Sequence, residues 1–238
     1  VFVHALNQDV GQAADMCQRE LRVIYRLEDN CGNQRFYTQS GVVRDDQKPN
    51  SSALPDVTLT TDINNAECPS QAGTSLVADL NNPVAQGGVP FTFTVAGITV
   101  DGPTNYSDDC TDKDLQPLYV QNVLIEQKGK CQQNITITFP IFASFGNFRD
   151  QSQKFTIIDA QKPNFAPLPT VTLTTEDDGA DCPVAATTSL SPGPNPVGQG
   201  GLPFTFTVAG VTVDGPTDYS DDCTSRDDQG VFVESIST

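Results

Sequence analysis

The sequence has no tryptophan, one methionine and a single histidine, His4. A Ser-His-Asp or Cys-His catalytic arrangement would have to use that histidine, and no nucleophile motif accompanies it. No GxGxxG segment opens a helix and no P-loop is present, so no nucleotide site is indicated. A carbohydrate-binding module would need an aromatic platform, which the lack of tryptophan and the presence of only five tyrosines disfavour. We therefore predict that the chain is not an enzyme.

Basic side chains are also few, since 13 Lys and Arg stand against 30 Asp and Glu and give a formal net charge of −17. This charge repels the phosphates of nucleic acids and an anionic lipid leaflet, so neither is expected as a partner. No stretch approaches the roughly 18 apolar residues of a membrane-spanning helix. We expect no membrane insertion in this segment.

The sequence does contain an internal repeat. Residues 87–113 recur at 200–226 with 22 of 27 positions identical. LPDVTLTT, which begins at Leu54, recurs as LPTVTLTT from Leu168, a shift of 114 residues. A period of this length is the size of one β-sandwich domain.

The first 50 residues fit the same frame. DDQKPN (45–50) falls on DAQKPN (159–164), again 114 residues apart. The chain is therefore predicted to hold the closing half of one repeat (1–50), a complete repeat (51–164) and the opening part of a third (165–238). Four alternating apolar residues of the first repeat also fall on four of the second: Leu21, Val23, Tyr25 and Leu27 on Ile135, Ile137, Phe139 and Ile141.

The two ends of the sequence overlap, because VFVESIST (231–238) resembles VFVHALNQ (1–8). A window cut from a longer tandem array would look like this. A protomer whose trailing half-domain is completed by the leading half of the next chain would look the same. We favour the first interpretation because a continuous repeat explains both ends without a special assembly rule.

Apolar residues alternate with polar ones over short segments such as FTFTV (91–95) and NITITF (134–139). Period-two alternation is typical of half-buried strands. Dense Pro and Gly turn signals separate these segments, and no sustained helical period occurs. We predict an all-β fold of tandem immunoglobulin-like β-sandwiches. Proline-rich links at 48–55 and 162–169 would make the array a rod.

The sequence resembles a known family at several short motifs. RLEDNCGNQ…GVVRDDQKP (26–49) is similar to the closing half of a hyalin-type (HYR-like) repeat, and ECP (67–69), DCP (181–183) and YSDDC (106–110, 219–223) are similar to its opening half. Such arrays occur in very large cell-surface adhesins of gliding Bacteroidota, of the SprB type. The resemblance departs at Phe145, where the CGN cysteine is missing. It implies extracellular display at the cell surface and adhesion.

The seven cysteines include no CxxC pair, which disfavours zinc and favours disulfides in an oxidising compartment. We favour a Cys110–Cys131 bridge within one domain, which gives Cys17 and Cys223 partners outside this sequence. A Cys68–Cys110 bridge is the close alternative. Buried thiols are the simplest remaining interpretation for some of them.

Acidic clusters recur in the repeats and could supply oxygen ligands for calcium, the one cofactor we consider. Solvated turn acids are the plainer interpretation, since EF-hand spacing is missing. The candidate calcium ligands are Asp108, Asp109, Asp112, Asp221 and Asp222.

Three sequons begin at Asn50, Asn105 and Asn134, and they are candidate glycosylation sites. Alternation along its strand places Asn134 on the outward face, where a glycan would be accommodated.

Two functions compete. The first is an adhesin or surface-fibre stalk, which touches neighbouring repeats of the same protein and binds surfaces or glycans many times over through avidity. The second is a structural filament subunit that associates head to tail, with half-domains or edge strands completed between chains.

Overall fold

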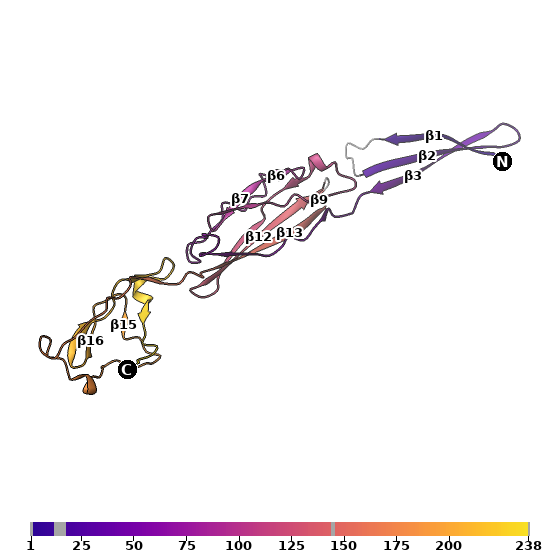
Figure 1. The fold of residues 1–238 in the computed structure, drawn as a ribbon. Helices are drawn as coiled ribbons and strands as arrows, with labels where there is room; N and C mark the ends of the chain where they lie inside the picture. Colours follow the sequence, from indigo (N-terminus) through magenta and orange to yellow (C-terminus); the bar gives the residue numbers. More distant parts are fainter. Residues whose placement is uncertain (1, 12–17, 144–145, 238) are drawn as a thin grey trace.

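The structure is a computed structural model that describes residues 2–11, 18–143 and 146–237, with side chains from residue 19 onwards. The described residues form strands, loops and single turns of 3-10 helix, which confirms the predicted all-β class. Their strand pairings all stay within one of three consecutive parts of the chain. We call these parts the N-terminal body (2–49), the central body (50–163) and the C-terminal body (164–237). They follow one another along an elongated molecule (Figure 1).

The N-terminal body is one antiparallel sheet in the order β1-β2-β3. A tight turn joins β2 to β3, in which the Asp29 carboxylate accepts hydrogen bonds from the backbone N–H of Cys31 (2.9 Å) and of Asn33 (2.8 Å). Large apolar side chains of this sheet remain in contact with solvent, among them Phe36, Val42 and Val43. The strands are β1 (Phe2–Gly11), β2 (Gln18–Glu28) and β3 (Gln34–Arg44).

The central body has a six-stranded sheet in the order β5-β13-β12-β10-β6, with β11 beside β12. β5 runs parallel to β13, and the other pairings are antiparallel. Two short pairs, β4-β9 and β7-β8, complete it. The strands are β4 (Asn50–Ser51), β5 (Val57–Thr60), β6 (Ala85–Gln86), β7 (Thr92–Val95), β8 (Ile98–Asp101), β9 (Tyr106–Ser107), β10 (Pro117–Leu118), β11 (Asn122–Gln127), β12 (Gln132–Phe142) and β13 (Phe148–Ile158); one 3-10 turn, η1 (Lys113–Leu115), precedes β10.

Among the residues whose side chains are described, the hydrophobic core cluster lies within the central body, between Leu59 and Ile157. Alternation along β12 points four side chains inward, and each of them is fully buried: Ile135, Ile137, Phe139 and Ile141. The β7-β8 hairpin forms a second layer over this face. The ring of Phe93 lies 6.1 Å from the ring of Phe139 and 6.0 Å from that of Phe155, measured between centroids.

The β7-β8 hairpin closes through a two-residue turn at Ala96 and Gly97, whose φ angles are 49° and 74°. Two successive positive φ angles define the turn type that matches strand twist in tight hairpins. Ala209 (φ 50°) and Gly210 (φ 76°) make the same turn in the C-terminal body. The local geometry of this hairpin therefore depends on its own sequence.

The C-terminal body contains only short strand pairs: β14-β18, β15-β19 and β16-β17. Residues 171–174, with the same VTLT sequence as β5, form no strand there. No described residue of this body belongs to the core cluster. Its strands are β14 (Asn164–Phe165), β15 (Gly198–Gln199), β16 (Thr205–Val208), β17 (Val211–Asp214), β18 (Tyr219–Ser220) and β19 (Gly230–Val231), with 3-10 turns η3 (Pro183–Ala185) and η4 (Arg226–Asp228).

Both outer bodies match parts of the central body in register. The β2-β3 hairpin runs from Gln18↔Arg44 to Glu28↔Gln34, and β12-β13 runs from Gln132↔Ile158 to Phe142↔Phe148, each pair 114 residues on. In the same way β16-β17 repeats β7-β8, and β14-β18 repeats β4-β9. The N-terminal body therefore shares the register of one hairpin with the central body, and the C-terminal body shares the registers of two short strand pairs.

Candidate functional site at the central–C-terminal junction

The last residues of the central body, from Asp159 onwards, form a short linker that is tied back to the residue after β5. The hydroxyl of Thr61 donates to Asp159 Oδ1 (3.0 Å) and accepts from the backbone N–H of Ala160 (3.1 Å). The backbone N–H of Asp159 donates to the carbonyl of Cys131 at 3.0 Å. These contacts fix the direction of the linker as it enters β14.

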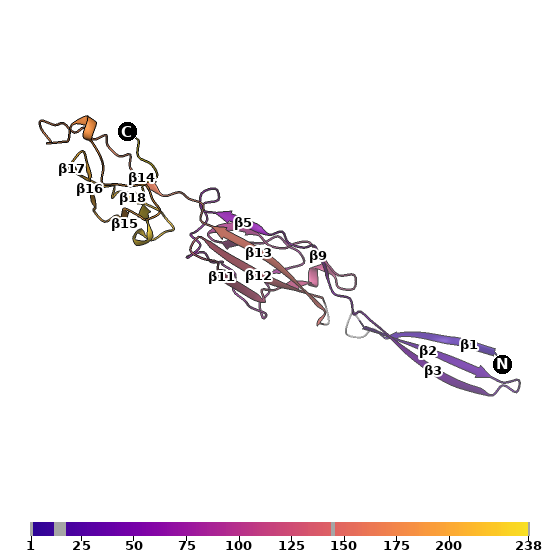
Figure 2. The same ribbon diagram turned by 90° about the horizontal axis from the view of Figure 1, so that it is seen from below.

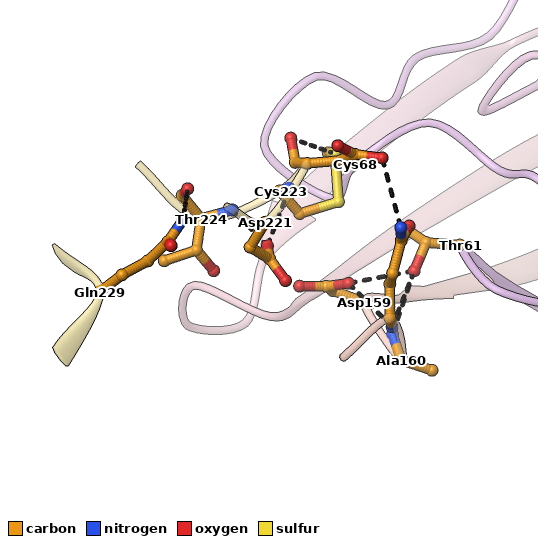
Figure 3. The surroundings of a disulfide bond; sticks show 10 residues. Thr61, Cys68, Asp159, Ala160, Asp221, Cys223, Thr224 and Gln229 are labelled. Atoms are coloured by element: carbon orange, nitrogen blue, oxygen red, sulfur yellow. Dashed lines mark hydrogen bonds between the residues drawn. A yellow bond between two sulfur atoms is a disulfide. The ribbon is translucent and has the colours of Figure 1, made fainter. Parts of the chain in front are cut away.

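The same junction carries a disulfide, which joins Cys68 to Cys223 (Figure 3). Cys68 lies in the loop that follows β5, at the end of the central body where the linker departs. Cys223 follows β18, and β18 pairs with β14 directly after the linker. The pairing of β14 with β18 therefore brings Cys223 close to Cys68, although 155 residues separate them in sequence.

Polar side chains add two further contacts between these bodies. The side-chain amide of Gln161 donates to Asp222 Oδ2 at 3.3 Å. Lys130 Nζ lies 2.9 Å from Asp228 Oδ1 across the junction. Both partners of this ion pair are largely exposed, so it adds little stability. The disulfide is therefore the strongest link between the two bodies.

An open crevice of about 510 Å³ lies beside the disulfide. Small and polar side chains form most of its wall, with no aromatic ring among them. Its lining residues are Ser70, Gln127, Gly129, Lys130, Cys223, Thr224, Ser225 and Asp228.

The observed disulfide corrects the predicted pairings. Cys131 forms no disulfide among the described residues, so the favoured Cys110–Cys131 bridge is not present. The alternative Cys68–Cys110 bridge is also wrong, because Cys68 is bonded to Cys223. The sequence argument assumed pairing within one domain and placed the partner of Cys223 outside the sequence. The pairing of β14 with β18, which decides the outcome, is too short to be read from the sequence.

Two of the other cysteines lie away from this disulfide. Cys31 is exposed within the Asp29 turn, and Cys182 is exposed in the C-terminal body. Cys17 and Phe145, on which parts of the pairing argument depended, lie outside the described residues.

The predicted calcium ligands fall into two equivalent loops. Asp108 accepts hydrogen bonds from the backbone N–H of Cys110 (3.0 Å) and Thr111 (2.8 Å). Asp221 accepts the same two bonds from Cys223 (3.0 Å) and Thr224 (2.7 Å). These carboxylates stabilise turns, as side chains of aspartate commonly do.

The remaining candidates do not join them in one ligand set. Asp222 accepts from Gln161 at the junction, and Asp112 precedes η1 while Asp109 is exposed. No group of three or more His, Cys, Asp or Glu with metal-binding geometry occurs in the part of the chain that the structure describes. Calcium stays a prediction, and a thermal melt with and without EDTA tests it: unchanged stability would rule it out.

The sequons differ in accessibility. Asn50 and Asn105 are exposed, and the Asn105 amide donates to Ser52 Oγ at 2.8 Å. The prediction that Asn134 is open to a glycan is wrong, since this residue is only 7% exposed. Its side chain does alternate away from Ile135, but its strand lies between β11 and β13 in the sheet, and Asn134 Oδ1 accepts a hydrogen bond from the Gln132 amide at 3.4 Å.

Three titrating groups are shifted by their surroundings. Burial raises the pKa of Tyr106, whose hydroxyl accepts the backbone N–H of Gly88 at 2.9 Å. The pKa of Asp29 is lowered chiefly by the side-chain hydrogen bond from Asn33, and that of Asp79 by the one from Asn82. Asp29 and Asp79 lie in loops and Tyr106 in the short strand β9, away from any common pocket, so they point to structural roles.

With this geometry the molecule is an all-β protein whose central and C-terminal bodies are joined by a disulfide. Comparison with protein-family models, with curated proteins and with solved structures finds no match to the chain. Among the described residues, no helix has the length and apolar character needed to span a membrane. The disulfide is compatible with an extracellular location.

Proposed function

We propose that the chain is a non-catalytic, extracellular part of a cell-surface adhesin or surface-fibre stalk, built of tandem immunoglobulin-like repeats with a period of about 114 residues. The observation that carries this proposal is the Cys68–Cys223 bond, which lies across a junction between two bodies. Bonds of this kind persist in oxidising compartments. A stalk needs stiff junctions, and this one has a covalent link beside a hydrogen-bonded linker.

The repeated registers support the tandem arrangement. The same hairpin occurs in the N-terminal and central bodies, and a second hairpin occurs in the central and C-terminal bodies. A stalk of such units would space binding surfaces from the cell. Each contact with a surface or glycan would be weak, and many contacts together would give adhesion by avidity.

Small-angle scattering and negative-stain microscopy test the stalk under non-reducing conditions. The comparison uses the wild-type chain and a variant with Cys68→Ser and Cys223→Ser. We expect a narrow distribution of angles between the central and C-terminal bodies in the wild type and a broad one in the variant. Cys182→Ser is the matched control, because Cys182 is the counterpart of Cys68 and is exposed without a disulfide among the described residues.

Peptide mapping under non-reducing conditions shows directly whether the Cys68–Cys223 disulfide has formed. A linked peptide containing Cys68 and Cys223 is expected. If that peptide is missing and both variants keep the wild-type shape, the stiff-stalk proposal is wrong.

A self-assembling filament subunit is the second candidate function. The observation in its favour is the uncovered apolar face of the N-terminal body, where Leu21 and Val43 are exposed.

A further inference from the structure

A free thiol lies at the end of the central body where the disulfide joins it to the C-terminal body. Cys131 is exposed and forms no disulfide among the described residues. It directly precedes β12, in the turn that joins β11 to β12. A cysteine recurs at this position of the repeat, because Cys17 stands 114 residues earlier in the sequence.

The turn that carries Cys131 reaches the C-terminal body on one side. Lys130 Nζ lies 2.9 Å from Asp228 Oδ1. Gly129 and Lys130 also line the crevice of about 510 Å³ that Cys223 lines from the opposite body. Cys131 therefore directly follows two residues that share a crevice with Cys223.

Hydrogen bonds connect Cys131 to the same place on its other side. The carbonyl of Cys131 accepts the backbone N–H of Asp159 at 3.0 Å, and Figure 3 shows Asp159 in the surroundings of the disulfide. Asp159 Oδ1 accepts the backbone N–H of Gln161 at 3.3 Å, and the side-chain amide of Gln161 donates to Asp222 Oδ2, also at 3.3 Å. Asp222 directly precedes Cys223. Both sides of the turn thus hold Cys131 in the neighbourhood of Cys223.

We propose that Cys131 is an internal nucleophile that replaces Cys68 as the disulfide partner of Cys223. Cys131 gives its proton to water, and the thiolate attacks Cys223 Sγ. The Cys68–Cys223 bond breaks, and Cys68 leaves as a thiolate that takes up a proton from water. One disulfide replaces another, so the exchange needs no oxidant and no reductant.

The crevice favours Cys223 as the sulfur that is attacked. Cys223 is among the residues that line it, together with the turn that precedes Cys131, whereas Cys68 is not. An attacking thiolate needs access to one sulfur of the disulfide. The open crevice provides that access from the side of the β11-β12 turn.

The exchange changes the point at which the C-terminal body is anchored. The observed bond ties this body to the loop after β5, which contains Cys68, and the exchanged bond would tie it to the start of β12. In both views of the ribbon the two bodies adjoin only at this end of the central body (Figure 1 and Figure 2). The junction would therefore have two covalent states. This inference goes beyond the stalk function, which needs only the observed bond.

The variant Cys68→Ser tests whether Cys131 reaches Cys223. The full chain is equilibrated in a glutathione redox buffer, its thiols are trapped with N-ethylmaleimide, and it is digested without reduction. We expect a peptide that links Cys131 to Cys223 as the main disulfide product. In the matched control, which carries both Cys68→Ser and Cys131→Ser, Cys223 should be recovered as a trapped thiol or a glutathione adduct. None of the three belongs to the core cluster, so these changes should not unfold the central body.

The wild type tests the exchange itself. Held in a mildly alkaline buffer, where thiolates form, it should yield the Cys131–Cys223 peptide and a trapped Cys68 thiol in equal amounts. Blocking the free thiols with N-ethylmaleimide before this incubation should abolish both products, and Cys131→Ser should do the same.

The proposal is overturned if Cys223 stays without a protein partner in Cys68→Ser, or if it pairs with a cysteine other than Cys131. It is also overturned if the wild type releases no Cys68 thiol. The stalk proposal is judged by a different result, the Cys68–Cys223 peptide of the wild type before incubation. A chain that has this peptide and never forms the Cys131–Cys223 peptide keeps the stiff junction and lacks the exchange, so the two failures are distinguishable.

Discussion

The central and C-terminal bodies contain the same VTLT tetrapeptide, at 57–60 and at 171–174. In the central body it is strand β5, paired with β13, and Leu59 is 4% exposed. In the C-terminal body it is not a strand. The turn after it is nevertheless the same, since the N–H of Asn64 bonds to the carbonyl of Thr60 and that of Asp178 to the carbonyl of Thr174. Turns follow from local sequence here, whereas this strand requires a distant partner.

The largest expected effect concerns the core. Phe93→Ala should lower the free energy of unfolding of the central body by about 3–5 kcal/mol, because this ring is 3% exposed and packs on Phe139 and Phe155. The counterpart Phe206→Ala should lower the free energy of unfolding of the C-terminal body by only about 1 kcal/mol, since Phe206 is half-buried. Denaturant titration, followed by hydrogen exchange in each body, measures both. Equal losses would show that the C-terminal body has a complete core of its own.

A smaller effect is expected at Tyr106 and at the equivalent Tyr219 of the C-terminal body. Tyr106→Phe leaves the N–H of Gly88 without its partner and should cost about 1–2 kcal/mol. Tyr219 accepts the N–H of Gly201 at 2.7 Å, but it is more exposed, so water can replace it and Tyr219→Phe should cost less.

Tyr106 should also make stability depend on pH. Because burial raises its folded-state pKa, the contribution of the protonated phenol is fully present below about pH 10 and is lost as pH rises further. Above this pH, the free energy of unfolding of the central body should fall more steeply with pH in the wild type than in Tyr106→Phe. The same slope in both proteins would contradict this assignment.

The smallest effect concerns two exposed turns. Asn82→Ala should raise the pKa of Asp79 towards its ordinary value, and Asn33→Ala should do the same for Asp29, because each asparagine donates to the carboxylate. Any stability from these groups is present above their ordinary pKa and is lost as pH falls through the lowered value. NMR titration measures both shifts. A shift at Asp79 without one at Asp29 would mean that turns, too, depend on packing beyond their local sequence.

Sequence reasoning was successful where the signal is local or periodic. Alternation in NITITF gave a strand with Ile135, Ile137 and Phe139 on one face, and all three are buried. The repeat placed Leu21 and Val23 in register with Ile135 and Ile137.

It failed where the outcome depends on neighbours distant in sequence. Alternation gave the direction of Asn134 correctly but not its burial, since β11 and β13 flank its strand. The disulfide was missed because a two-residue pairing, β14 with β18, places Cys223 beside the preceding body. No composition or spacing rule contains that information.

Hydrogen–deuterium exchange of the two VTLT segments, in one sample of the full chain, tests most directly whether this strand requires a distant partner. In dilute solution the amides of residues 57–60 should be protected, and those of residues 171–174 should exchange almost freely. Equal protection of both segments in dilute solution would contradict the account, because the C-terminal body would then form this strand without a partner.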